Sequence, residues 1–330
     1  MPALLNKPTS LWNNFHPAPP ETVRTTPQTV SEPSSRYVMQ IETLPLSYRY
    51  IHRSDAAIAP VPLVLDSPHS GTEYPPDFDP SVPHGQLRTA EDTWVADLWA
   101  GALDHGVPLL AARFPRSYID ANRSLDEIDP LLLAEPWPEP LPESAKVRLG
   151  KGLVWRMMDD GTPIYARKLA LDEIRHRINE CWKPYHERLA SAMDATHAAC
   201  GQVWHINCHS MPSVAAQFAT DKPGLVHPDF VLGDRDGETA APEFREFVAA
   251  FLTERGYSVS VNDPYKGVEI VKRCGDPANG RHSLQVEINR KLYMDEITLR
   301  PNAGFEKLRK DLADLTAEML RWMRTELAKA

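Results

Sequence analysis

The sequence predicts a three-layer α/β/α fold, with helices on both faces of a central mixed, mostly parallel sheet. From residue 61 onward, short runs rich in apolar residues alternate with longer stretches of helical periodicity, which is the pattern of an α/β protein. With 330 residues, 42% of them hydrophobic, the chain is long enough to bury a large core. The expected strands cover residues 61–65, 107–112, 203–207, 230–232, 257–261 and 284–288. The expected helices cover residues 93–104, 172–199, 242–254 and 303–329.

Two of these helices carry distinctive residues. The helix expected over residues 172–199 contains Pro184, which lacks a backbone N–H, so a kink or a split is expected there. Trp182 and His186 flank this proline, and the sequence leaves open whether they contact a functional site, although packing is favoured. The helix expected over residues 303–329 has apolar residues at helical spacing, so it is expected to pack on the sheet.

The chain divides into two regions of different composition. Residues 1–45 are rich in Pro, Thr, Ser and Asn and show no periodicity, which predicts an extended or disordered arm on the surface or on a partner subunit. Residues 46–330 are expected to form a single domain. A homo-oligomer held through the arm is therefore one possible assembly.

Charge and cysteine content exclude several classes of protein. A formal charge of -9 and the lack of a long basic run argue against a nucleic-acid partner. No apolar stretch approaches the roughly 18 residues that span a bilayer, and no secretory leader is recognisable at the start, so neither a membrane nor export is expected. The widely spaced cysteines suit reduced thiols in the cytoplasm. They are Cys181, Cys200, Cys208 and Cys274.

Two of the expected strands, 61–65 and 203–207, are followed closely by a His-Ser pair, at His69 and His209. The carboxyl ends of parallel strands meet at one edge of a sheet, where ligands bind, so these imidazoles are candidate ligands of one metal ion. A hydrolytic metal site needs about three protein ligands and an open position. Asp92 is preferred as the third ligand, ahead of Glu73 and Glu91, although an Asp there would also suit a helix cap. The alternative for each histidine is a structural hydrogen bond.

Further candidates for catalysis lie after one expected strand and inside another. Arg116, Asn122 and Arg123 lie in the segment that follows residues 107–112. Arginines beside an Asn can bind a substrate carboxylate and polarise a carbonyl. Structural pairing of Arg with Asp explains this run equally well. Glu287 lies inside an apolar strand, where a charge is costly unless it is paired or functional, and burial beside a metal would suit a general base.

Together these motifs resemble the N-formylglutamate amidohydrolase family. The motifs that carry the resemblance are residues 67–71 (SPHSG), 117–123 (SYIDANR), 208–210 (CHS), 232–237 (LGDRDG) and 284–295. The resemblance spans about residues 61–296. It implies a fold related to the zinc carboxypeptidases and to the succinylglutamate desuccinylase and aspartoacylase group, a zinc or other divalent ion, and a small N-acyl amino acid as substrate. It also implies a role in histidine breakdown.

The resemblance assigns a role to each candidate residue. It implies that His69, Asp92 and His209 bind the metal and that Glu287 is the catalytic glutamate. Asn122 and Arg123 would hold the substrate's α-carboxylate, and Arg116 would stabilise the oxyanion. This sequence departs from the family in its long N-terminal arm, which leaves the assembly open. It also departs at Thr72, which stands where zinc carboxypeptidases have the acidic ligand, so that ligand stays open.

Three rival functions remain. The first is hydrolysis of another N-acyl amino acid or a small peptide, because the sequence does not fix the size of the acyl pocket. The second is a binding protein that has lost catalysis. The third is a cysteine hydrolase using Cys208, which is disfavoured because Cys208 and His209 are consecutive and would point to opposite faces of a strand.

Overall fold

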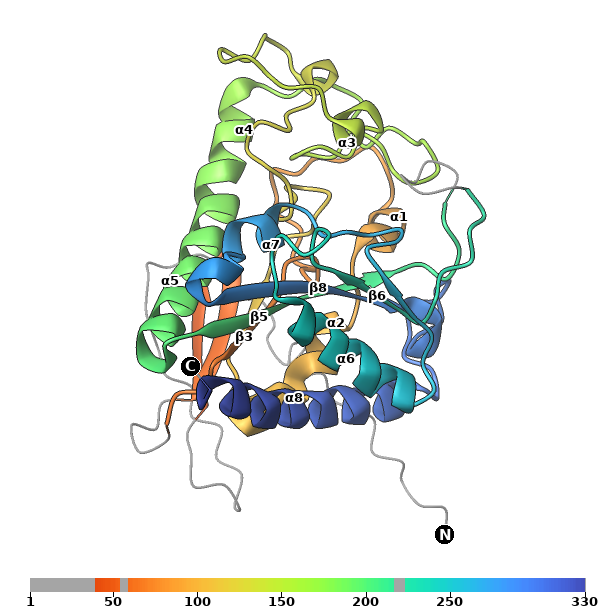
Figure 1. The fold of residues 1–330 in the computed structure, drawn as a ribbon. Coiled ribbons are helices and arrows are strands. Elements are labelled where there is room, and N and C mark those ends of the chain that lie inside the picture. The colour runs from red at the N-terminus through yellow and green to blue at the C-terminus, as the bar shows by residue number, and fades with distance from the viewer. Residues whose placement is uncertain (1–38, 54–58, 217–222, 330) are drawn as a thin grey trace.

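The computed structural model describes residues 39–53, 59–216 and 223–329. Within these residues, eight strands form one mixed sheet in the order β1-β2-β4-β3-β5-β8-β6-β7 (Figure 1). They are β1 (Met39–Leu44), β2 (Tyr48–Arg53), β3 (Leu63–Ser67), β4 (Leu109–Ala112), β5 (Val203–Met211), β6 (Phe230–Gly233), β7 (Val259–Val261) and β8 (Arg281–Asn289). The central pairs β4/β3, β3/β5 and β5/β8 are parallel, as is β6/β7, whereas β1/β2, β2/β4 and β6/β8 are antiparallel. The predicted mixed, mostly parallel sheet is confirmed.

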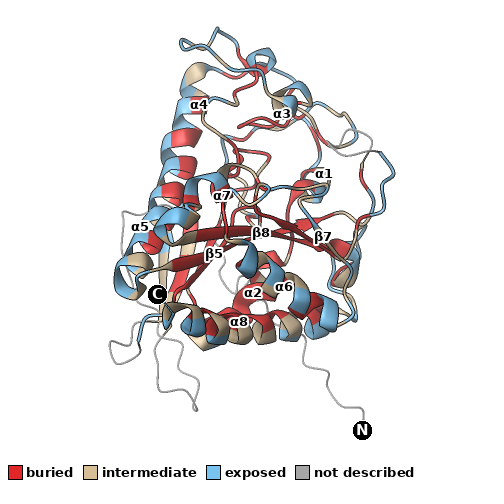
Figure 2. Ribbon diagram, viewed as in Figure 1, coloured by how far each residue is buried: buried red, intermediate tan, exposed pale blue. Residues whose placement is uncertain are grey.

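The helices form a layer on each face of the sheet. They are α1 (His84–Leu87), α2 (Val95–Trp99), α3 (Ala145–Arg148), α4 (Leu171–Arg177), α5 (Lys183–Cys200), α6 (Pro242–Glu254), α7 (Glu269–Cys274) and α8 (Phe305–Leu327). One apolar core joins α2, α6 and α8 to the sheet, and a second joins α5 and α7 to its other face. In Figure 1, α2, α6 and α8 lie below β5 and β8, and α7 lies above them. Figure 2 shows β5 and β8 buried between these layers. Among the described helices, none is long and apolar enough to cross a bilayer.

The first two strands were not predicted. β1 pairs with β2, so the sheet begins at Met39, inside the region that the sequence assigned to the arm. β1 lies at the edge of the sheet and is only half-buried, and an edge strand of that kind needs no apolar run. The rest of the predicted arm, residues 1–38, lies outside the described residues, and so does its proposed contact with a partner subunit.

The long helix expected over residues 172–199 is interrupted near its proline. A π-helical turn, Ile178–Trp182, separates α4 from α5 and ends two residues before Pro184. Proline cannot donate the usual hydrogen bond, and the wider turn accommodates this loss. The helix expected over residues 93–104 is α-helical only in α2 and continues as a 3₁₀ segment, Ala100–His105.

Candidate active site

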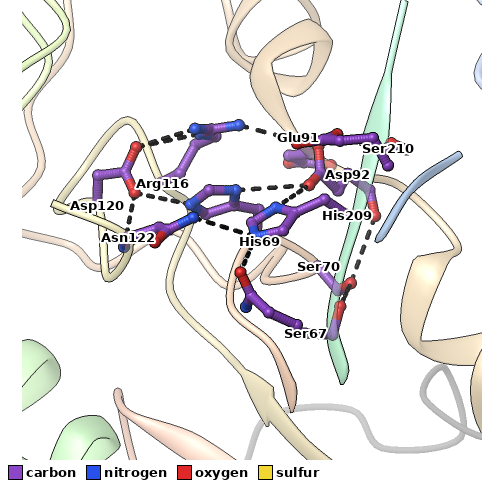
Figure 3. Close-up of polar contacts among 12 residues, drawn as sticks. Ser67, His69, Ser70, Glu91, Asp92, Arg116, Asp120, Asn122, His209 and Ser210 are labelled. Carbon is purple, nitrogen blue, oxygen red and sulfur yellow. Dashed lines mark hydrogen bonds and ion pairs between the residues drawn. The ribbon is translucent and has the colours of Figure 1, made fainter. Parts of the chain in front are cut away.

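Two strands bring the two histidines together. His69 lies two residues after β3 ends, and His209 lies near the end of β5, the strand next to β3 in the sheet. Their ring centroids are 4.7 Å apart (Figure 3). The loop after His69 packs tightly on the exit of β4, because a Cβ on Gly71 would lie 2.0 Å from the carbonyl oxygen of Phe114. Only glycine allows this approach, which holds His69 beside the segment that follows β4.

Asp92 lies against both imidazoles. Its Oδ2 is 3.0 Å from Nδ1 of His209 and 3.4 Å from Nδ1 of His69. The backbone sets this position, since the N–H of Asp92 donates to the carbonyl of His69 at 2.9 Å. The side chain does not cap α2, which starts at Val95, so the alternative of a helix cap is wrong. Burial alone would raise the pKa of Asp92, but the hydrogen bond with His209, the nearby imidazole of His69 and the charge of Arg116 hold it well below its usual range.

The donor atoms of these three residues suit a divalent cation. One ligand atom from each of His69, Asp92 and His209 lies within 4.8 Å of the others, and all three residues are buried. Nδ1 of His69 is buried without a hydrogen-bond partner, which is unusual for an imidazole nitrogen. Its Nε2 donates to Oδ1 of Asp120 at 2.7 Å, so the lone pair is on Nδ1 and faces Asp92 and His209. A carboxylate behind a histidine in this way is typical of metal ligands.

The two other acids that the sequence offered as third ligand lie elsewhere. Glu73 is 39% exposed and forms ion pairs with Arg49 and Arg113. Glu91 is buried, but its carboxylate accepts hydrogen bonds from Tyr74 and Arg88. Of the three candidates, Asp92 is the one in contact with the histidines.

Arg116 bridges two carboxylates at the site. Its Nη2 donates to Oδ2 of Asp120 at 3.0 Å, and its Nη1 is 3.9 Å from Oδ1 of Asp92. The guanidinium also lies 4.9 Å from the ring centre of Trp155. Burial lowers the pKa of Arg116, but the charges of Asp120 and Asp92 outweigh it and raise that pKa. The cation is therefore fixed beside the histidine pair, as Figure 3 shows.

Asn122 and Arg123 lie deeper than their predicted role suggests. The amide of Asn122 is 1% exposed, and its Nδ2 is 3.1 Å from Nε2 of His209. Arg123 is 4% exposed and donates through Nε to the carbonyl of Lys151 at 3.0 Å. Both residues belong to the inner wall of the site, where Asn122 contacts a histidine directly.

Glu287 lies on the strand next to His209. The parallel register of β5 and β8 pairs these two residues, so their side chains share one face of the sheet. Gln285 donates to Oε1 of Glu287 at 2.8 Å. Burial raises the pKa of Glu287, an effect that His209 opposes and Asp92 reinforces. Cys208 points the other way, into the apolar core, and burial raises the pKa of its thiol, so the geometry needed for a cysteine hydrolase is absent.

Three site residues received no role from the sequence. Asp120 accepts a hydrogen bond from His69. Its place in the motif at residues 117–123 could have indicated a role in the site. Arg290 donates to Oδ1 of Asp92 at 3.2 Å and to the carbonyl of Glu91 at 2.8 Å, and it directly follows β8. Asn207 lies 2.8 Å from Nε2 of His209 through its Oδ1. The sequence signal for Asn207 was its place two residues before His209, on the same face of a strand.

Fold and site together define an α/β protein with a buried His-Asp-His group and a buried glutamate at one edge of its sheet. The chain belongs to the N-formylglutamate amidohydrolase family, whose model matches residues 61–294. It is accordingly a hydrolase of amide C–N bonds.

Individual relatives agree with this assignment. The chain is 29% identical to an N-formylglutamate deformylase of Pseudomonas aeruginosa, over 79% of this chain and 90% of that one. It is also 29% identical to an N-formylglutamate deformylase of Pseudomonas putida, over 72% and 83%. A crystal structure of an N-formylglutamate amidohydrolase from Ralstonia eutropha is 46% identical and superimposes with a TM-score of 0.80, covering 85% of this chain and 99% of that one.

Proposed function

We propose that this protein is a metal-dependent deformylase that hydrolyses N-formyl-L-glutamate to formate and L-glutamate. The observation that carries the proposal is the buried group His69, Asp92 and His209 with Glu287 in register beside it. The relatives named N-formylglutamate deformylase support the substrate.

His69, Asp92 and His209 would hold the ion in this proposal. Two imidazoles and a carboxylate are a common set for zinc, and the lone pair on the partnerless Nδ1 of His69 suits a cation. A bound cation of this kind polarises a carbonyl and lowers the pKa of water.

Two protein side chains would then transfer the proton and stabilise the negative charge that develops on the oxygen. Glu287 accepts a proton from the attacking water, whose oxygen bonds to the formyl carbon, and later gives that proton to the amide nitrogen as the C–N bond breaks. A carboxylate with a raised pKa suits this exchange because it takes up a proton more readily than an ordinary glutamate. Arg116 supplies a fixed positive charge near the developing oxyanion.

Positive charge beside the site favours an acidic substrate. Arg116 and Lys151 both lie over the ring of Trp155, at 4.9 and 5.5 Å from its centre. Burial, followed by the charges of Arg123, Arg116 and Lys151, lowers the pKa of Lys146 to about 7. N-formyl-L-glutamate brings two carboxylates, and Asn122 and Arg123 remain the proposed holders of the α-carboxylate.

The test is formate release from N-formyl-L-glutamate by the purified protein. N-formyl-L-glutamine is the matched control because it differs only in the charge of the side chain, and we expect its kcat/KM to be lower by about tenfold or more. Release of acid from N-acetyl-L-glutamate faster than formate from the formyl substrate would instead favour another N-acyl amino acid. No turnover of any of these substrates, together with no bound metal, would favour a binding protein.

A further inference from the structure

A second group of buried polar side chains lies behind His209, and the proposed reaction does not use it. Oδ1 of Asp66 accepts hydrogen bonds from Nδ2 of Asn207 at 2.7 Å and from Nε2 of His205 at 2.9 Å. Oδ2 of Asp66 accepts from the hydroxyl of Tyr185 at 2.7 Å. All four residues are fully buried. A carboxylate this deep is costly, so its place on the face of the sheet that carries the site calls for an explanation.

Asp66 determines which way the amide of Asn207 points. Burial alone would raise the pKa of Asp66, but the hydrogen bonds from His205, Tyr185 and Asn207 hold it below its usual range, so the group is an acceptor. Asn207 must therefore direct its NH₂ toward Asp66. Its oxygen consequently faces Nε2 of His209, at 2.8 Å.

A second asparagine contacts the same nitrogen with the opposite chemistry. The backbone N–H of Ile270 donates to Oδ1 of Asn122 at 2.9 Å, which turns the NH₂ of Asn122 toward His209. Its Nδ2 lies 3.1 Å from Nε2 of His209. Asn207 thus favours the tautomer of His209 with hydrogen on Nε2, and Asn122 favours the one with hydrogen on Nδ1.

These two tautomers differ in whether His209 can bind a metal through Nδ1. With hydrogen on Nε2, the lone pair on Nδ1 faces Asp92 and His69. With hydrogen on Nδ1, that atom instead donates to Oδ2 of Asp92, 3.0 Å away. We propose that Asn207, held by Asp66, is a positioning residue that selects the metal-binding tautomer of His209. Asn122 favours the other tautomer. This inference rests on the metal site of the proposed function.

The test compares Asn207→Leu with Asn122→Leu, using zinc ions alone as the probe. The two variants are matched because each removes a buried amide that contacts the same nitrogen. We expect Asn207→Leu to weaken zinc affinity about 10–100-fold, the usual effect of losing such an outer partner. Asn122→Leu should leave zinc affinity unchanged or raise it. The readouts are the zinc Kd from chelator competition and the thermal midpoint of each metal-free variant.

A further variant tests the part of Asp66. Asp66→Leu should weaken zinc binding in the same direction, and the double variant with Asn207→Leu should bind no more weakly than Asn207→Leu alone, because the two residues act as one unit. If Asp66→Leu does not fold, the comparison of Asn207→Leu with Asn122→Leu still tests the proposal.

Each outcome has a distinct meaning. Equal zinc affinity of the wild type and Asn207→Leu, or an equal loss in both asparagine variants, would overturn this proposal and leave the proposed function intact. A wild type that releases formate but binds no zinc would overturn the metal site and this proposal with it.

Discussion

β5 and β8 have two buried faces, one apolar and one polar. Toward α2, α6 and α8 the two strands direct Trp204, Ile206, Cys208, Leu284, Val286 and Ile288. Toward α5 and α7 they direct His205, Asn207, His209, Ser283, Gln285 and Glu287. All twelve side chains are buried. Alternate residues of the same two strands therefore build an apolar core on one face and a polar layer on the other.

Contact with solvent does not explain the polar layer, because each of its side chains is at most 8% exposed. Burying a polar side chain costs free energy unless it is hydrogen-bonded, and partners such as Asp66 and Gln285 meet that need here. Paired polar groups stabilise less than a packed apolar layer, so function is the better reason for them. The comparison implies that changes on the polar face lower activity, whereas changes on the apolar face lower stability.

The largest effect is expected at Glu287. Glu287→Gln removes the proposed proton acceptor and keeps the shape of the side chain, so kcat should fall about 10²–10⁴-fold. Steady-state formate release measures this, and the thermal midpoint should stay within a few degrees of the wild type. Turnover within about tenfold of wild type would remove Glu287 from the reaction.

A residue on the opposite face of the same strand should behave in the reverse way. Leu284→Ala empties part of the apolar core and should lower the free energy of unfolding by about 2–5 kcal/mol. Denaturant titration measures the loss, and formate release per folded molecule should match the wild type. A large drop in kcat of the folded variant would contradict the division between the faces.

Stability of the layer that supports the polar face should depend on pH through His186. Burial lowers the pKa of His186 to about 4, while its Nε2 donates to the carbonyl of Ala121. The unfolded chain binds the proton more readily, so stability is present above about pH 6.5 and is lost as pH falls toward 4, by about 3 kcal/mol at most. Denaturant titrations across this range measure the slope, and it should flatten in His186→Gln. An unchanged slope would assign the acid sensitivity to other groups.

The smallest effect is expected at Asp120. Asp120→Asn weakens the acceptor behind His69, and zinc affinity should fall about 10–100-fold. Chelator competition measures it. Glu73→Gln is the control, because the carboxylate of Glu73 forms ion pairs with Arg49 and Arg113 and does not contact the histidines. A comparable loss in both variants would point to a general charge effect.

The sequence predicted the central sheet well because β3, β4 and β6 are short apolar runs, and β5 and β8 carry an apolar residue at every second position. The bounds of α6 were also predicted, since Pro242 marks its first turn. β1 escaped prediction because a half-buried edge strand has a weak pattern. His69 and His209 were found from strand ends, but the pairing of Asp120 with His69 joins residues 51 positions apart. Such a contact depends on how two loops meet, which no local pattern records.

The central claim is that the polar face holds one divalent ion that the reaction needs. The most direct test is to strip the purified protein of metal, add zinc in steps, and follow formate release from N-formyl-L-glutamate. We expect negligible release without metal and a linear rise that saturates at about one zinc per chain. Full turnover by the metal-free protein would contradict it.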